Sequence, residues 1–574
     1  MLLLCSCAAS RNAEHVFHVL TTNDVHGHYF DSLYVGDKVS TSLVSASWYV
    51  DSLRTAVGKD NVILVDVGDF LQGDNAAYYY NYVDTTSKHL FARMAEHMKY
   101  DAVIVGNHDV ETGHAVYDRL GAQMSVPLLA SNAIRTDNGK PYFQEYAILK
   151  RHGLKIAVIG FTNPGIPGWL SPELWSGMTF KELIPYAQMV VDRVKAEEKP
   201  DLVIVAVHGG VGRKDYKYIE NPGMALFGSL KDVDMLLCAH DHRPVVHDAD
   251  SIALVNAGSH CKHVGHGVLK VKVKGGKVES VVTDASLIKT DPEKVDVVMR
   301  EKFHADYQAV KAFTLRKVGE LKTELRTVDA YAGMSDYINL IHTLALTSVP
   351  EAQVSFAAPL TYDGTVKAGE LVYNDLFTIY PYENQLFVVK MTGKEIKDCL
   401  EYSYNNWIYT YDPAKPHLLK IRKSSDPRTG QKGWSFVGRS YNFDSAGGLV
   451  YDVDVTKKNG ERVKIVSFAD GTPFDEAETY NVAMTSYRAN GGGGILKDGA
   501  GIDTSNIAER VVARYPEIRE MLYDFILRHG MIDSKLIGDP SVVGSWKFTP
   551  EDIAGKYLDA DMQLMFGEGF KSER

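Results

Sequence analysis

Seven polar side chains in the first half of the chain have the residue types of an open metal site. They are Asp24, His26, Asp69, Asn107, His208, His240 and His242. All of them offer nitrogen or oxygen donors and none offers a thiolate, which favours Zn²⁺, Mn²⁺ or Fe in a catalytic site over a structural zinc site built on cysteine. This set is too large for one tetrahedral ion and suits two divalent ions. Asp69, whose carboxylate has two oxygens, is the natural bridge between them.

A pair of divalent ions predicts phosphoryl-transfer chemistry. Two ions ~3.5–4 Å apart can hold a phosphoryl group and lower the pKa of a bound water, so that a metal-bound hydroxide attacks phosphorus in line. The departing oxygen then needs charge relief or a proton. His108, which follows Asn107, is placed to supply it as general acid without binding metal. A carboxylate would orient its imidazole: Asp109 is adjacent, and Glu111, three residues on, can turn back towards it.

Each candidate ligand follows a short apolar run. The runs are Val16–Thr22, Asn61–Val67, Ala102–Val105, Leu202–Val207 and Val233–Cys238. Their length and their Gly-rich, polar ends predict strands buried on both faces, separated by helices such as Leu183–Glu197. Ligands of α/β sheets bind beyond the carboxyl ends of strands, where all of these side chains fall. One Asp-Val-His alone is more often a turn, and a lone His208 is more often an interior histidine. Because all seven residues occur in order at strand ends, we favour metal ligands over these structural roles.

The second half of the chain has a different pattern. A charged, helix-prone stretch around Glu293–Gln308 predicts a linker over residues 291–326, between a first domain at 14–290 and a second at 327–548, with a C-terminal tail at 549–574. The second domain is expected to open with a helix at Asp329–Leu346. Strands are predicted at Leu386–Met391 and Leu449–Val455, and a helix at Gly393–Ser403. The fold class that follows is α/β (α+β) in two domains.

Composition limits the function classes. The 574 residues are 45% hydrophobic and 24% charged, as in ordinary globular proteins, and no apolar run approaches the ~20 residues of a spanning helix. The 62 Lys and Arg against 73 Asp and Glu give a formal net charge of −11. This acidic balance argues against a nucleic-acid polymer as partner, while a small anionic substrate can be met by a local site.

The N-terminus indicates export. Residues 1–13 look like the remnant of a bacterial secretory signal, with a short apolar stretch before small residues. The Leu4–Cys7 segment loosely resembles a lipoprotein signal, in which Cys7 would be acylated. We therefore expect an exported monomer, periplasmic or on the outer surface and lipid-anchored, with a ragged cytosolic N-terminus as the alternative. Five cysteines are too few for a disulfide framework.

Five short blocks carry a family resemblance. DVH at 24–26, GDFLQGD at 68–74, GNHD at 106–109, the strand-end His208 and HDH at 240–242 resemble the motifs of calcineurin-like metallophosphoesterases, over Val16–Lys272. The resemblance implies a four-layer β-sandwich flanked by helices, with His108 as the catalytic histidine. It implies two sets of metal ligands, Asp24, His26, Asp69 and His242 for one ion, and Asp69, Asn107, His208 and His240 for the other.

The second half resembles the C-terminal domain of the 5'-nucleotidase family, in Leu371–Leu400 and in Tyr441–Gly494. That family includes UDP-sugar hydrolases and 2',3'-cyclic-nucleotide 2'-phosphodiesterase/3'-nucleotidases, and its C-terminal domain stacks the base between two aromatic rings. Tyr487 matches one ring position, and Tyr441 is preferred to Phe443 for the other. The implied substrate-binding residues are Asn107, Tyr441, Phe443, Tyr487 and Asn490. Tyrosines that merely pack a small domain are the alternative.

Two departures from the 5'-nucleotidase pattern narrow the prediction. Glu111 stands where the family has an aspartate that partners the catalytic histidine. Gly493 stands where the family has an aspartate that holds the free ribose hydroxyls, and a 2',3'-cyclic phosphate has no diol to hold. We therefore expect a two-metal 2',3'-cyclic-nucleotide 2'-phosphodiesterase/3'-nucleotidase whose domains close on a hinge. A 5'-nucleotidase/UDP-sugar hydrolase, a hydrolase of a non-nucleotide ester and a non-catalytic surface binding protein are the alternatives.

Overall fold

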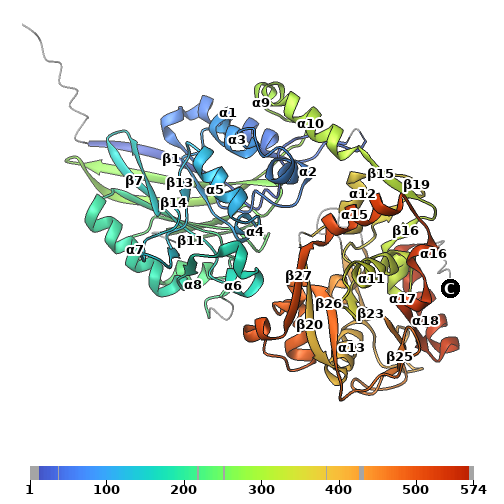
Figure 1. The fold of residues 1–574 in the computed structure, drawn as a ribbon. Helices are drawn as coiled ribbons and strands as arrows, with labels where there is room; N and C mark the ends of the chain where they lie inside the picture. Colours follow the sequence, from blue (N-terminus) through green and yellow to red (C-terminus); the bar gives the residue numbers. More distant parts are fainter. Residues whose placement is uncertain are drawn as a thin grey trace, which may run out of the picture. The chain divides into compact units, whose positions relative to one another are not determined.

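The computed structural model describes residues 12–36, 38–215, 219–249, 252–382, 384–425 and 432–567. The chain forms two compact units, Met1–Thr314 and Leu315–Arg574 (Figure 1). Most of the predicted signal remnant, including Cys7, lies outside the described residues. In the described part of the chain, no helix combines the length and the apolar character needed to cross a membrane.

Two six-stranded sheets form the centre of the first unit. The order in the first sheet is β14 (Lys277–Lys289), β13 (His263–Lys274), β1 (Asn12–Thr22), β2 (Val62–Asp66), β3 (Ala102–Ile104) and β4 (Leu128–Leu129). The order in the second sheet is β11 (Val245–Ala249), β12 (Ile252–Asn256), β10 (Met235–Cys238), β9 (Leu202–Val207), β7 (Leu154–Phe161) and β6 (Tyr146–Arg151). Strands β1 to β4 are parallel to one another, as are β7, β9, β10 and β12.

Alternate residues of each strand enter different cores, which gives four layers. In β1, Val19 lies between the two sheets, and Leu20 packs towards helices on the outer face of the first sheet. Those helices are α1 (Leu43–Val57), α3 (Leu90–Met98) and α5 (His114–Gln123). Helices α7 (Leu183–Glu198) and α8 (Gly223–Ser229) cover the outer face of the second sheet (Figure 1). The predicted sandwich flanked by helices is confirmed.

The strands that precede the candidate ligands lie where the sequence predicts them. The predicted strand at 202–207 has the bounds of β9, and β1, β2, β3 and β10 fall within one to four residues of their predicted bounds. Strands β2 and β9 are fully buried along their length, as expected for strands covered on both faces. The predicted helix at 183–197 is α7.

The predicted linker contains two helices that belong to the first unit. They are α9 (Val297–Lys302) and α10 (His304–Thr314). Met299, Phe303 and Val310 are buried in the same core as α1 and α3. The boundary between the units falls between Thr314 and Leu315, because apolar burial extends the first unit over this charged stretch.

The second unit is built on a five-stranded sheet with helices. The strand order is β23 (Ser445–Gly447), β17 (Val354–Ala357), β26 (Thr479–Thr485), β20 (Gln385–Thr392) and β27 (Val511–Glu517). Helix α11 (Asp336–Ser348) packs on β17, and α13 (Gly393–Trp407) follows β20, with Thr392 and Glu395 forming its capping box. Much of the predicted tail is helix α18 (Glu551–Phe566), whose Leu558 and Met562 are buried in the core of this unit.

Candidate metal site

All seven predicted ligands meet at one edge of the sandwich. Asp24 and His26 follow β1, Asp69 follows β2, and Asn107 opens α4 (Asn107–Glu111) after β3. The three remaining histidines follow β9 and β10 of the second sheet. Both sheets therefore present the carboxyl ends of their parallel strands to the same place, as predicted. Asp24, Asp69 and His208 are almost completely buried, and the His242 side chain is 44% exposed, so the site opens to solvent on the His242 side.

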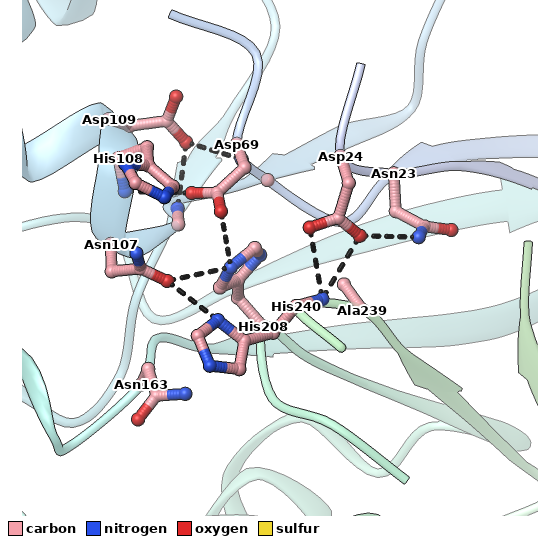
Figure 2. Close-up of polar contacts among 12 residues, drawn as sticks. Asn23, Asp24, Asp69, Asn107, His108, Asp109, Asn163, His208, Ala239 and His240 are labelled. Carbon is pink, nitrogen blue, oxygen red and sulfur yellow. Dashed lines mark hydrogen bonds and ion pairs between the residues drawn. The ribbon is translucent and has the colours of Figure 1, made fainter. Parts of the chain in front are cut away.

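One group of ligands centres on Asn107 (Figure 2). The Oδ1 atom of Asn107 lies 3.1 Å from Nε2 of His208 and 2.9 Å from Nδ1 of His240. The Oδ2 atom of Asp69 lies 3.0 Å from the same nitrogen of His208. The ligand atoms of Asp69, His208 and His240 all lie within 4.8 Å of one another, a spacing that a single cation can span.

A second group consists of Asp24, His26 and His242. The Nε2 atoms of the two histidines are 2.9 Å apart, and Nε2 of His242 is 3.5 Å from Oδ1 of Asp24. Two imidazole lone pairs cannot approach so closely unless a proton or a cation lies between them. Because the donors are nitrogen and oxygen atoms that converge in this way, both groups fit divalent metal ions.

Three of the ligand histidines are held in the form that binds metal. Burial lowers the pKa of His26 and of His240 to about 3, and that of His242 to about 4. Their imidazoles are therefore neutral at physiological pH and have a lone pair available. Metal ligation requires this deprotonated state.

His208 and Asp69 form an ion pair inside the site. Burial alone would lower the pKa of His208, but the charge and hydrogen bond of Asp69 raise it to about 9, and burial raises the pKa of Asp24 to about 7. Without a cation, His208 and Asp69 thus form a buried ion pair with a proton between them. A divalent cation displaces such a proton, because it supplies the positive charge that the carboxylates require.

The backbone fixes the orientation of two ligand rings. Nδ1 of His208 is 2.7 Å from the carbonyl oxygen of Val67, and Nδ1 of His26 is 3.1 Å from that of Gln72. Each ring donates its Nδ1–H to a carbonyl, which directs Nε2 into the site. On His208, a cation would take the place of the proton that Nε2 shares with Asp69. Gln72 lies in the GDFLQGD block, three residues after Asp69. This position was the sequence signal that could have identified it as a neighbour of the ligands.

Two further neighbours of the ligands were not predicted. The Nδ2 group of Asn23 donates to Oδ2 of Asp24 at 2.7 Å, and its position directly before Asp24 was the available signal (Figure 2). The indole ring of Trp169 stacks on His240, with ring centroids 5.3 Å apart and planes at 16°. Nothing in the local sequence of Trp169 connects it with the site.

His108 lies beside both ligand groups and pairs with Glu111. Its backbone N–H donates to Oδ1 of Asp69 at 2.8 Å, and its ring centroid is 5.4 Å from that of His26. Nδ1 of His108 is 2.5 Å from Oε2 of Glu111, one helical turn away. The imidazole is 34% exposed, so its other nitrogen can reach a substrate.

Asp109 does not orient His108, which corrects its place among the catalytic candidates. Its buried carboxylate accepts hydrogen bonds of 2.8–3.0 Å from the backbone N–H groups of Gly106, Asp69, Phe70 and Leu71. Figure 2 shows the carboxylate beside Asp69. Asp109 therefore shapes the loop that carries Asp69. Both carboxylates were considered from the sequence; only the longer side chain of Glu111 turns back to the imidazole.

In the second unit, three tyrosines from separate segments gather. Tyr441, on the 3₁₀ turn Ser440–Asn442, is half-buried, and Tyr487, on α14 (Ser486–Ala489), is 38% exposed. Tyr382 packs its ring edge-on against Tyr441 at 6.3 Å. Burial and the phenols of Tyr441 and Tyr487 raise the pKa of Tyr382, which places it close to both. Tyr382 was not a candidate, although its motif Tyr380–Asn384 was part of the family resemblance.

The remaining two candidates differ in exposure. Asn490 is the C-cap of α14, three residues after Tyr487, and is half-buried. Phe443 is completely buried, and its ring stacks on Trp407 at 5.3 Å and 7°. A ring inside the core has no free face for a base, so the inclusion of Phe443 among the substrate-binding residues is corrected: it is a core residue.

The fold and the site together define a metal-dependent phosphoester hydrolase. Residues 17–244 match the family model of the calcineurin-like phosphoesterases, and residues 317–498 match that of the 5'-nucleotidase C-terminal domain. The chain therefore combines a calcineurin-like phosphoesterase domain with a 5'-nucleotidase C-terminal domain that follows it.

Relatives cover nearly the whole chain at low identity. The trifunctional nucleotide phosphoesterase protein YfkN of Bacillus subtilis is 23% identical over 95% of this chain, which spans only 40% of that protein's length. The 2',3'-cyclic-nucleotide 2'-phosphodiesterase/3'-nucleotidase of Salmonella typhimurium is 25% identical over 96% of this chain and 91% of its own. A Staphylococcus aureus structure described as a candidate 5'-nucleotidase has a TM-score of 0.74 at 21% identity, covering 93% of this chain and 99% of its own; that likeness concerns the fold.

Proposed function

We propose that the chain is a dinuclear-metal nucleotide phosphohydrolase of the 2',3'-cyclic-nucleotide 2'-phosphodiesterase/3'-nucleotidase type. The observation that carries this proposal is the placement of Asp69 between two groups of ligands. Its Oδ2 atom contacts His208, and its charge acts on His26 of the other group. A carboxylate that serves both groups supports two ions with a shared ligand rather than two separate sites.

The chain's own residues supply the rest of the chemistry. When bound, two divalent ions polarise phosphoryl oxygens and lower the pKa of a water molecule towards neutrality. Asn107 holds its amide oxygen at the ion site and directs the following residue, His108, towards the phosphoryl group. Glu111 accepts the Nδ1–H of His108 and so fixes the tautomer. The Nε2 atom of His108 is then placed to stabilise or protonate the departing sugar oxygen.

The preference for a cyclic or 3'-phosphate rests on the surroundings of Gly493. A side chain at Gly493 would clash with the guanidinium of Arg488 and with the side-chain amide of Asn442. An acidic residue that holds a ribose diol therefore has no room here, which supports a substrate without a free 2',3'-diol. The Salmonella relative, whose name carries both activities, points in the same direction. The alternative is a 5'-nucleotidase/UDP-sugar hydrolase.

A substrate panel tests this proposal. 5'-AMP, 3'-AMP, 2',3'-cyclic AMP and UDP-glucose are supplied to the purified chain with Mn²⁺ and, separately, with Zn²⁺. We expect kcat/KM to be highest for 2',3'-cyclic AMP, followed by 3'-AMP. His108→Ala serves as the control: it should lower kcat by about 10²–10⁴, the contribution of a general acid, with an unchanged metal content.

Two outcomes would overturn the proposal. A clear preference for 5'-AMP or UDP-glucose would favour the alternative specificity. Metal binding without turnover of any of the four substrates would instead favour a non-catalytic binding protein.

A further inference from the structure

A buried ion pair lies directly behind the tyrosines of the second unit. The side chains of Arg488 and Asp444 are each 3% exposed, with Nη2 of the arginine 2.7 Å from Oδ2 of the aspartate. The Nε–H group also donates to Oδ1 of Asp444 at 3.0 Å. Removing two charges from water costs about as much as their attraction returns, so a buried pair is a poor source of net stability. Its position therefore has to be explained by what the pair holds in place.

The guanidinium of Arg488 connects two separate segments of the chain. On one side it donates to the carbonyl oxygen of Tyr441 at 2.5 Å and to Oδ1 of Asn442 at 2.8 Å. On the other side it donates to the carbonyl oxygen of Gly492 at 3.1 Å. A planar fork with five N–H donors can hold several acceptors in a fixed relative geometry, which a lysine ammonium cannot do.

Each of these segments carries or supports one of two rings, Tyr441 or Tyr487. Tyr441 belongs to the first segment. Gly492 packs closely against the ring of Tyr487. A Cβ atom at Gly492 would lie only 2.4–2.5 Å from three carbons of that ring, so only glycine fits there. The guanidinium carbon itself lies 5.2 Å from the centroid of the Tyr487 ring. One face of Tyr487 is thus supported from behind by groups that Arg488 holds.

We propose that Arg488 is a positioning residue that sets the separation between the Tyr441 and Tyr487 rings. It thereby determines specificity for a phosphoester that carries an aromatic base over one that does not. This inference rests on the proposed function, since it takes the two rings to be the base-binding surface. Arg488 does not contact the base; it acts through the backbone of Tyr441 and through Gly492.

The test uses Arg488→Lys in the full chain, which keeps the charge and removes the fork. Binding of adenosine is measured by isothermal titration calorimetry, and hydrolysis is measured with 2',3'-cyclic AMP and with glycerol 2-phosphate, which has no ring. We expect the adenosine Kd and the KM for 2',3'-cyclic AMP to rise about tenfold, the scale of one stacked base. The kcat for the nucleotide and the kcat/KM for glycerol 2-phosphate should stay within about twofold of the parent values, because no catalytic group moves.

Two comparison variants separate this proposal from simpler explanations. Arg462→Lys is the matched control: Arg462 is also buried and donates to the backbone carbonyls of Lys457, Tyr404 and Ile408, outside the tyrosine cluster. It should lower the unfolding temperature without changing adenosine binding. Tyr487→Ala tests whether the two rings form the base-binding surface, because it removes one ring.

The outcomes are distinguishable. Unchanged adenosine binding in Tyr487→Ala would refute the two rings as the base-binding surface, whereas the substrate panel above tests the proposed function itself. Weakened binding in Tyr487→Ala but parent-like binding in Arg488→Lys would refute the role of Arg488 alone. An equal loss in Arg488→Lys and Arg462→Lys would show a general packing effect and also refute it. If Arg488→Lys does not fold, Asn442→Ala, which removes one acceptor of the fork, must weaken adenosine binding for the proposal to stand.

Discussion

Replacing Asp109 by asparagine tests whether this carboxylate builds the loop under the predicted metal ligand Asp69 rather than assisting His108. The substitution keeps the size and shape of the side chain and exchanges one acceptor oxygen for an NH₂ group. Oδ1 accepts the N–H groups of Phe70 and Leu71, and Oδ2 accepts those of Asp69 and Gly106. Whichever oxygen is lost, two buried backbone donors then face another donor.

The size of the effect follows from these contacts. A buried donor left without an acceptor costs ~1–3 kcal/mol, so two of them predict a destabilisation of the first unit by about 2–6 kcal/mol. The strain falls on the segment that begins with Asp69. Loss of a group that orients a ligand typically lowers metal affinity by about 10–100-fold. We therefore expect Asp109→Asn to lose stability, metal affinity and turnover together.

Glu111→Gln is the matched comparison, since it also exchanges one carboxylate oxygen for an amide, two residues from Asp109. Glu111 contacts the His108 ring and none of the predicted metal ligands in the described contacts. Metal content by elemental analysis and unfolding temperature by calorimetry should match the parent protein. The kcat should fall, because the imidazole loses the charge that fixes its tautomer and supports its protonated form.

The two variants thus predict opposite patterns. If Asp109→Asn bound metal with parent affinity, unfolded like the parent and lost only kcat, Asp109 would be acting on His108 and our assignment would be refuted. A Glu111→Gln variant that lost metal would contradict the separation between the ligands and the His108–Glu111 pair.

Two other expectations concern metal removal and pH. Chelation should selectively lower the unfolding temperature of the first unit in a calorimetric scan, because ions at a thousandfold excess over Kd stabilise a fold by ~4 kcal/mol. Re-addition of Zn²⁺ or Mn²⁺ should reverse the change. An unaltered scan would contradict a metal site. Burial lowers the pKa of His342 to about 3, so below pH ~6.5 the unfolded chain binds a proton that the fold excludes, which removes about 2 kcal/mol of stability at pH 5. His342→Asn should flatten the pH dependence of urea unfolding between pH 7 and 5 by that amount. An unchanged slope would show that folding does not lower the pKa of His342.

The convergence of the candidate metal ligands could be predicted because its information is local. The strands that precede Asp24, Asp69 and His208 are short apolar runs, and a polar residue at the end of a buried strand has few structural uses. The order of the clusters along the chain then assigns them to one edge of an α/β sandwich. A local sequence pattern of fewer than ten residues is therefore enough to predict each strand and the ligand that follows it.

The contacts around the ligands could not be predicted in the same way. Which carboxylate reaches His108 depends on side-chain length and on where the Asp69 loop passes, since N–H groups of that loop and of Gly106 occupy both oxygens of Asp109. Phe443 and Tyr441 are two residues apart and both aromatic, yet only one is buried. Burial of this kind depends on distant partners such as Trp407, which a local pattern does not contain.

The backbone conformation of the ligand loops could not be predicted from local sequence either. It also explains how the site keeps its geometry. Five of the predicted ligands have positive φ angles: Asp24 (47°), His26 (49°), Asp69 (59°), His240 (72°) and His242 (56°). A non-glycine residue in this region costs about 1–3 kcal/mol and persists only where the surroundings impose it. Here the loop after β1 is bonded to the loop after β2, through the N–H of Asp24 to the carbonyl of Gly68 and that of His26 to the carbonyl of Asp69, each at 2.9 Å. Because these bonds join two protein loops, the strained geometry of Asp24, His26 and Asp69 belongs to the scaffold itself, and these predicted ligands are preorganised without a cation.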